Sequence, residues 1–305
     1  MVNANLNPTA AIARSIGLAE ASDAELHLSM PIFDSRIDAA TGYLNVDQIT
    51  TLRRQFAEPF DEKLAQYCNV LASQGVRAVG HTAWGKHAHE AIIDSVLALS
   101  PDLVITELSR DDFAHRWSVR KSSDWRLVRL CPSPLMLVQP GSPPLPQKIC
   151  AAVDPQHSER RRAPELDERV LEQARILAGT VKKPLEVAHV FPHESGDAKL
   201  STLVDEIVVQ LQEADRHGFH QFANEQQVPP EHRILLRGDP VPTMIHYADA
   251  NEVDVLVIGS QYRTGVGRLY LGSNAESLIA RCNCDVLLVR PDGFFDEIKT
   301  QHSKD

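Results

Sequence analysis

An internal repeat constrains this chain more than any other feature of its sequence. Residues 102–140 run from an aspartate and an apolar segment through a polar stretch to a cysteine, a short apolar segment and a proline. Residues 254–291 show the same order of features about 151 residues later, half of the 305-residue chain. A period of that length is typical of a duplicated domain, and ~150 residues is an ordinary domain size. We therefore expect two similar domains in tandem.

Short apolar segments in the second half predict five strands, at residues 147–153, 185–191, 232–237, 254–259 and 285–290. Their β-branched composition is typical of strands that are buried on both faces of a parallel sheet. Apolar residues spaced by three and four predict helices between them, at residues 165–178, 200–222, 240–250 and 273–281. Alternating strands and helices indicate right-handed crossovers. The expected fold class is α/β, with two doubly wound, Rossmann-like parallel-sheet domains.

The first half follows the same pattern with one gap. It predicts strands at residues 25–31, 77–83, 102–108 and 134–139, and helices at 8–20, 47–74, 87–99 and 122–130. Nothing before residue 8 resembles the strand at 147–153, so the first domain lacks its opening strand. Either the natural chain starts upstream of Met1, or another element fills that position in the sheet.

A proline-rich segment separates the halves. Four prolines and a glycine lie within seven residues, namely Pro140, Gly141, Pro143, Pro144 and Pro146. Such a composition makes a stiff, exposed connector. We therefore expect a first domain at residues 1–140, a linker at 141–146, a second domain at 147–291 and a charged, loose tail at 292–305.

Charge and hydropathy limit the classes of partner. The formal net charge is −10, whereas nucleic-acid binders collect phosphates on a basic face, so no nucleic-acid partner is expected. No apolar run is long enough for a membrane helix, and residues 1–8 lack the order of a signal peptide. These features predict a cytoplasmic protein without a membrane partner. The five cysteines agree, because an odd number in mostly apolar segments is typical of buried free thiols.

Known metal and catalytic motifs are missing from the sequence. Cys282 with Cys284, and His87 with His89, each lack a second pair of ligands, so we expect no metal site. A histidine at a strand end, such as His189, is more often a satisfied structural residue than a ligand. The G-x-S-x-G, G-x4-G-K-[ST] and H-E-x-x-H motifs are all absent. We therefore predict no catalytic residues.

A glycine-rich loop follows the strand at 254–259 and leads into the helix at 273–281. Ser273 with Glu276 has the spacing of a capping box. Backbone N–H groups at a helix N-terminus attract anions, and open α/β sheets bind ligands at the carboxyl ends of their strands. Arg263 and Arg268 would add positive charge for phosphates. The plainer interpretation, that the glycines only let the loop turn, stays open.

The loop resembles the phosphate-binding loop of the universal stress protein family, whose nucleotide-binding members carry G-x2-G-x9-G-[ST]. Gly259, Tyr262, Gly272 and Ser273 occupy the four positions here, so the spacing is kept and Tyr262 replaces the second glycine. A tyrosine brings a bulky side chain to a place where the backbone approaches phosphate. The resemblance implies ATP or ADP, with Mg²⁺, as the cofactor of the second domain. The corresponding stretch of the first domain, residues 107–122, has no glycine.

The resemblance implies further nucleotide-binding positions at strand ends and around the loop. The whole candidate set is Val153, Asp154, Val190, Gly238, Ile258, Gly259, Ser260, Tyr262, Gly272, Ser273 and Asn274. Asp154 corresponds to an aspartate that contacts the nucleoside, and Val190 to a position that lines the adenine pocket. Each has a plainer role as well: Asp154 as a cap, Val190 as a core residue and Gly238 as a turn residue. Together they carry more weight, because parallel strand ends share one edge of a sheet.

The resemblance covers nearly the whole chain and is similar to the tandem, E-type members of that family. It implies a non-enzymatic stress-response regulator in which the two domains pair through their last strands, at 134–139 and 285–290. A homodimer and an unidentified protein partner are further expectations. Two alternatives stay open. One is a slow ATPase that uses Asp154 and the loop with Mg²⁺. The other is a module that binds an apolar ligand or a protein partner, with Tyr262 filling the phosphate site.

Overall fold

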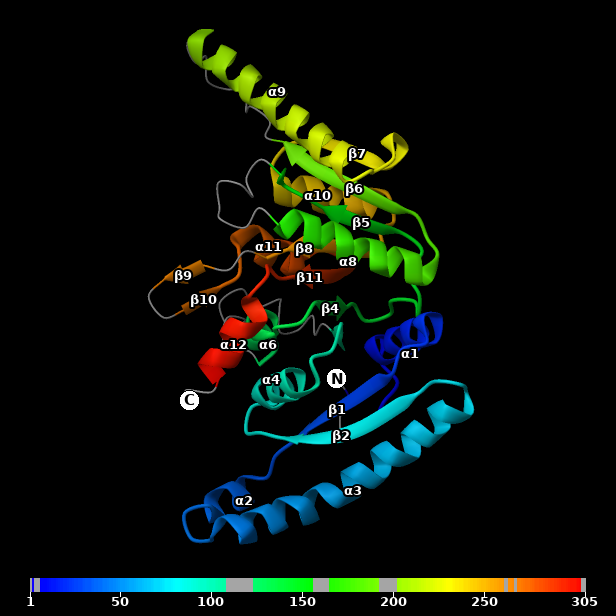
Figure 1. Ribbon diagram of the computed structural model, residues 1–305, viewed down its shortest axis with the longest axis vertical. Coiled ribbons are helices and arrows are strands. Elements are labelled where there is room, and N and C mark those ends of the chain that lie inside the picture. The colour runs from blue at the N-terminus through cyan, green and yellow to red at the C-terminus, as the bar shows by residue number, and fades with distance from the viewer. Residues whose placement is uncertain are drawn as a thin grey trace. The chain divides into compact units, whose positions relative to one another are not determined.

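The computed structural model describes residues 2, 6–107, 123–155, 165–191, 202–260, 263–265 and 268–302. The chain divides into two compact units (Figure 1). The first unit consists of residues 1–145 with 298–305, and the second of residues 146–297. The division therefore falls within the proline-rich segment, between Leu145 and Pro146.

Five parallel strands form the sheet of the second unit, in the order β11-β8-β5-β6-β7. They are β5 (Ile149–Ala152), β6 (Leu185–Phe191), β7 (Arg233–Arg237), β8 (Val255–Gly259) and β11 (Asp285–Val289). Every residue of β11 is buried, as are Val255–Ile258 of β8, which explains their uninterrupted apolar composition. The sheet confirms the predicted α/β class.

Helices cover both faces of this sheet. They are α8 (Leu166–Val181), α9 (Thr202–Glu225), α10 (Pro240–Ala250) and α11 (Ser273–Arg281). His189 of β6 stacks on Phe219 of α9, whereas Glu186 of the same strand hydrogen-bonds Tyr247 of α10. Residues 186 and 189 point to opposite faces of a strand, so α9 and α10 lie on opposite faces of the sheet. A 3-10 turn, η2 (Pro230–His232), precedes β7.

The first unit contains two pairs of parallel strands among its described residues. β1 (Leu26–Ile32) pairs with β2 (Ala78–Trp84), and β3 (Val104–Glu107) pairs with β4 (Leu135–Val138). The helices of this unit are α1 (Ala10–Ser22), α2 (Ser35–Ala40), α3 (Val46–Ser73), α4 (Ala88–Leu99) and α6 (Ser123–Leu130). α3 packs on β2, and α4 packs on both β1 and β2.

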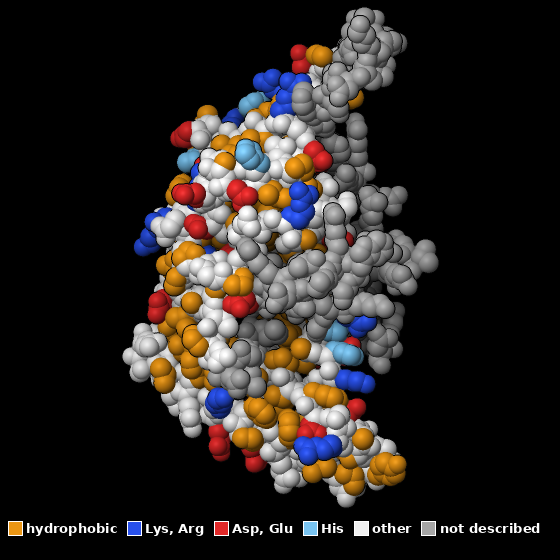
Figure 2. All heavy atoms as spheres, turned by 180° about the vertical axis from the view of Figure 1, so that it is seen from behind, with side chains coloured by type: hydrophobic (Ala, Val, Ile, Leu, Met, Phe, Trp, Pro, Cys, Tyr) orange, Lys and Arg blue, Asp and Glu red, His pale blue; other side chains and the backbone are white. Residues whose placement is uncertain are grey.

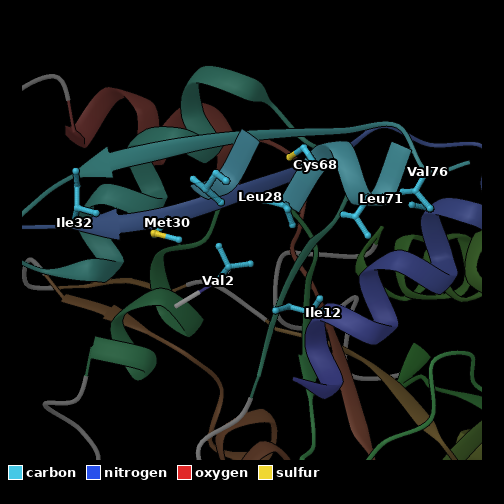
Figure 3. Close-up of a cluster of buried hydrophobic side chains, with 10 residues drawn as sticks. Val2, Ile12, Leu28, Met30, Ile32, Cys68, Leu71 and Val76 are labelled. Atoms are coloured by element: carbon cyan, nitrogen blue, oxygen red, sulfur yellow. The ribbon is translucent and has the colours of Figure 1, made fainter. Parts of the chain in front are cut away.

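A cluster of buried side chains from β1, α1 and α3 forms a core of the first unit (Figure 3). Met30 and Leu64 are completely buried within it. Among the described residues, no strand precedes α1. Val2 is 3% exposed, and its backbone N–H donates a hydrogen bond to the carbonyl of Ser29 in β1, at 3.1 Å. Val2 therefore satisfies a backbone acceptor of β1 and fills part of the core.

The expectation of a loose tail is wrong for residues 294–302, which form α12 (Phe294–His302). Phe294 and Ile298 are each 3% exposed. Their spacing of four places both side chains on one face of the helix, and that face is buried. The segment is therefore an amphipathic helix, although its many charged residues suggested an exposed tail.

Charges of both signs are interspersed on the described surface drawn in Figure 2, without a continuous basic area. This distribution agrees with the acidic net charge of the chain. In the described ranges, no helix combines the length and apolar character needed to cross a membrane.

Candidate functional site

The carboxyl ends of the strands in the second unit bring most of the predicted site residues to one edge. Ala152 of β5 lies opposite Ile258 of β8 and Ala188 of β6. Since the three strands are parallel and in register there, the residues that follow Ala152 lie level with Val190 and with the end of β8. Open α/β sheets bind their ligands at this edge.

Gly259, at the end of β8, is required by packing. A Cβ atom at this position would lie 2.8 Å from Cγ and 2.9 Å from Cδ2 of Leu166, the first residue of α8. The glycine thus lets the start of α8 approach the strand end closely. This contact supports a structural role for the first glycine of the loop.

Gly238, between β7 and α10, is required by its backbone conformation. Its φ is +152°, and an added Cβ atom would lie 2.3 Å from Oγ1 of Thr243. Its N–H donates to the carbonyl of Phe191 at the end of β6, at 3.0 Å. Gly238 is therefore a turn glycine that directs the chain from the strand edge into α10.

Gly272, before α11, has neither constraint. Its φ is −59°, and an added Cβ atom would meet no described residue within 4 Å. The predicted capping box is wrong: Gly272 is the N-cap residue, it supplies no side-chain cap, and Ser273 is the first helical residue. Ser273 and Asn274 are exposed. The N-terminus of α11 thus lacks a cap from its own N-cap side chain, which is the arrangement that favours an anion.

The described residues between Gly259 and Gly272 include two short strands. β9 (Arg263–Gly265) and β10 (Arg268–Tyr270) form an antiparallel pair in which Arg263 lies opposite Tyr270. Tyr262, the residue that departs from the family motif, lies outside the described residues.

Ser260 and Arg290 form a buried pair at the ends of β8 and β11. Arg290 Nη1 donates to Ser260 Oγ at 2.9 Å, and Arg290 is 4% exposed. Its guanidinium lies 4.8 Å from the ring centre of Phe294. Sequence analysis included Ser260 but missed Arg290. The available signal was a charged residue at the end of a fully apolar strand, where a buried cation adds positive potential to the sheet edge.

The apolar members of the candidate set differ in exposure. Val153 is 4% exposed and Ile258 is 3% exposed, so both belong to the core. Val190 is only partly buried. Of the three, Val190 offers the most surface to a ligand at this edge.

Asp154 lies within a compact polar cluster that the sequence analysis missed. One side-chain atom from each of Asp154, His189 and Asp215 falls within 4.8 Å of the others. His189 Nε2 is 3.4 Å from Asp215 Oδ1. The backbone N–H of Asp154 donates to Oδ1 of Asp167 in α8, at 2.9 Å. Asp215 comes from the middle of α9, where the sequence carries no motif that would signal it.

Comparison with known proteins agrees with this architecture. Residues 146–290 match the model of the Universal stress protein family. Universal stress protein E of Escherichia coli K12 is 23% identical over 317 aligned positions, which cover 100% of this chain and 97% of that protein. Universal stress protein E of Photorhabdus laumondii is 22% identical over 294 residues, with 95% and 93% covered.

A solved structure of a functionally unknown protein from Pseudomonas aeruginosa PAO1 has a similar fold. It superposes with a TM-score of 0.72 at 22% identity, and the match covers 96% of this chain and 92% of that one. At this identity the likeness concerns the fold alone. It confirms the expected tandem arrangement of two Rossmann-like α/β domains.

Proposed function

Because the chain belongs to the universal stress protein family and resembles its E-type members along its whole length, we propose that it is a non-enzymatic, cytoplasmic regulator whose second domain binds ATP or ADP. Family membership itself supports a role in the stress response. The observation that carries the nucleotide part of the proposal is the open N-terminus of α11 at Gly272.

The residues around α11 fit a phosphate group. Gly272 leaves space where a side chain would otherwise stand, and its backbone needs no positive φ. A glycine without a steric or conformational reason of its own is the one that close approach of a ligand explains best. The first N–H groups of α11 can then donate to phosphate oxygens, which the helix dipole favours. Mg²⁺, when bound together with the nucleotide, would neutralise part of the charge of the phosphates.

The strand edge fits the nucleoside in the same proposal. Val190 is partly exposed at the end of β6, and Asp154 follows β5 in register with it. An apolar side chain beside a carboxylate suits a flat base with an attached hydroxyl-bearing sugar. Val153 and Ile258 support this surface from the core.

An ATP titration of variants by calorimetry tests the proposal. Gly272→Asp places a negative charge at the α11 N-terminus, so we expect binding of Mg-ATP to be lost. Gly179→Asp is the matched control, because Gly179 in α8 is exposed and an added Cβ there would also meet nothing within 4 Å in the described part of the chain. Equal affinity of the two variants would contradict a phosphate site at α11.

Tyr262→Gly separates the nucleotide proposal from a binding module that takes an apolar ligand or a protein. The substitution restores the family motif and removes the bulky side chain from the loop. Stronger binding of ATP in this variant supports a phosphate loop that Tyr262 weakens. No binding by either protein favours the binding module. Conversion of bound ATP to ADP would instead favour the slow ATPase.

The division into a first domain at residues 1–140, a linker at 141–146 and a second domain at 147–291 is part of the same proposal. The first domain would serve as a pseudo-domain without a nucleotide. Pairing of the two domains through their last strands stays a prediction, as do a homodimer and a protein partner.

A further inference from the structure

Three side chains near the carboxyl edge of the second unit form a compact set of metal-binding atoms. Asp154 follows β5, His189 belongs to β6 and Asp215 to α9, and one ligand atom from each lies within 4.8 Å of the other two. His189 is 1% exposed and Asp215 is 7% exposed. Two of the three side chains are therefore buried, which distinguishes this cluster from an exposed acidic patch.

The orientation of His189 is fixed on two sides. Its Nδ1 lies 3.0 Å from the carbonyl oxygen of Val153. A carbonyl can only accept, so Nδ1 carries a proton, and in the neutral imidazole Nε2 then carries the lone pair. The imidazole ring stacks on Phe219, with ring centres 5.5 Å apart and an interplanar angle of 18°. A backbone carbonyl that holds the distal nitrogen is the usual support for a metal-binding histidine.

Two facing atoms of this cluster lack hydrogen-bond partners among the described residues. His189 Nε2 and Asp215 Oδ1 are both buried, and neither makes a hydrogen bond there. They lie 3.4 Å apart. When the imidazole is neutral and protonated on Nδ1, both atoms present lone pairs to the same space. Buried polar atoms are nearly always satisfied in native proteins, so two facing lone pairs require an explanation. A cation between them satisfies both.

We propose that Asp154, His189 and Asp215 bind a divalent transition-metal cation, with Zn²⁺ as the best-suited ion. Two carboxylates neutralise its charge, and imidazole nitrogen is a ligand that Zn²⁺ takes and that Mg²⁺ and Ca²⁺ disfavour. Tetrahedral coordination with bonds of ~2.0–2.2 Å sets neighbouring ligand atoms roughly 3.4 Å apart. The separation of His189 Nε2 and Asp215 Oδ1, 3.4 Å, already has that value. Three protein ligands leave a fourth position for water or a substrate group.

This site is separate from the Mg²⁺ that would accompany ATP. The nucleotide-associated ion is held by phosphates, whereas the proposed ion is held by three protein side chains and needs no nucleotide. Asp154 belongs to both proposals, whereas Asp215 belongs to the zinc proposal alone, so the Asp215→Asn variant distinguishes failure of zinc binding from failure of nucleotide binding.

Zinc content after chelation and dialysis against Zn²⁺ tests the proposal. We expect one high-affinity Zn²⁺ per chain, measured by inductively coupled plasma mass spectrometry. Asp215→Asn and Asp154→Asn keep the side-chain shape and remove a charged ligand, so each should weaken Zn²⁺ binding at least tenfold. Glu213→Gln and His217→Asn, two exposed positions on α9, are the matched controls and should bind as the wild type does. Equal binding by all five proteins would overturn the assignment.

Absorption spectra of the wild-type protein with Co²⁺ test the ligand set without relying on any variant to fold. A tetrahedral site of nitrogen and oxygen ligands gives visible bands without thiolate charge transfer. We expect those bands, and expect Zn²⁺ to displace them. Thiolate charge-transfer bands would place the ion at cysteines such as Cys282 and Cys284 and would overturn the proposal. Absence of any bound Co²⁺ or Zn²⁺ would overturn it as well and would leave His189 and Asp215 as a metal-free buried pair.

Discussion

The three glycines around the candidate nucleotide site are required for different reasons. At Gly259, close contact with Leu166 leaves no room for a Cβ atom. At Gly238, a positive φ and the proximity of Thr243 exclude a side chain. An added Cβ atom at Gly272 would meet none of the described residues, and its φ is ordinary, so in the proposed nucleotide site it is the bound phosphate that accounts for this glycine. The glycine pattern alone could not separate these cases, because the contact with Leu166 depends on how α8 packs against β8.

The same substitution at two of these glycines should therefore have opposite consequences. Gly259→Ser forces a side chain into Leu166 and should cost about 1–3 kcal/mol of unfolding free energy. Gly272→Ser supplies an N-cap hydroxyl to α11. The free energy of unfolding should therefore stay equal or rise by roughly a few tenths of a kcal/mol. That hydroxyl competes with phosphate for the same N–H groups, so affinity for ATP should fall. Urea unfolding followed by circular dichroism, with an ATP titration, checks both. A destabilised Gly272→Ser protein with unchanged ATP affinity would contradict this account.

Cys150 gives the second unit a pH dependence on the alkaline side. Burial raises the pKa of its thiol above the ordinary value. The folded protein keeps this proton where the unfolded chain loses it. The contribution to stability is thus complete below the unfolded pKa of ~8.5 and falls by about 1.4 kcal/mol per pH unit above it.

Cys150→Ala removes this ionisation, and the stability of the variant should fall less steeply between about pH 9 and pH 11. Urea unfolding in the presence of reductant, at several pH values, measures the two slopes. The absolute stability of the variant should be lower because a buried sulfur is lost, so the slope is the decisive quantity. Parallel curves for both proteins would show that Cys150 does not titrate as its burial requires.

At the scale of elements, long periodic segments were predictable and short ones were not. The five strands of the second unit and the helices α8–α11 were expected from continuous apolar runs and from apolar spacings of three and four. The prediction missed α2, the β9–β10 pair and α12. α2 has six residues, none of them buried, and begins at a cap in which Asp34 accepts from the N–H of Arg36. β9 and β10 have three residues each, too few to show a period.

α12 provides a test at this scale, because one face of it is buried within an otherwise charged segment. Phe294→Ala removes a ring that is 3% exposed and that lies beneath the guanidinium of Arg290. We expect a loss of about 3–5 kcal/mol of unfolding free energy. Phe295→Ala is the matched control, since its side chain is only partly buried, and it should cost clearly less. Equal losses in denaturant unfolding would mean that α12 does not pack through this face.

The residues of the candidate site were likewise predictable only in part. Strand ends converge at one edge by the topology of a parallel sheet, so Asp154, Val190 and Ser260 could be grouped from the sequence. Asp215 and Arg290 could not. Asp215 meets His189 only because α9 crosses β6 at that point, and Arg290 meets Ser260 only through the register of β11 with β8. Contacts between elements carry this information, and periodicity within one element does not.

At the scale of the whole molecule, the two tandem domains are unequal. The second carries Gly259, Gly272 and the open start of α11. The corresponding stretch of the first, residues 107–122, contains no glycine, and residues 108–122 of it lie outside the described ranges. If only the second domain has the proposed phosphate site, the chain should bind one nucleotide. Two equivalent domains would bind two.

Native mass spectrometry of the purified protein, with and without Mg-ATP, tests the central claim most directly. It reports the bound mass and the number of chains in the same spectrum. We predict one adenine nucleotide per chain, retained by Gly179→Asp and absent from Gly272→Asp. Two nucleotides per chain, or none with Mg-ATP in large excess, would contradict a single nucleotide site in the second domain.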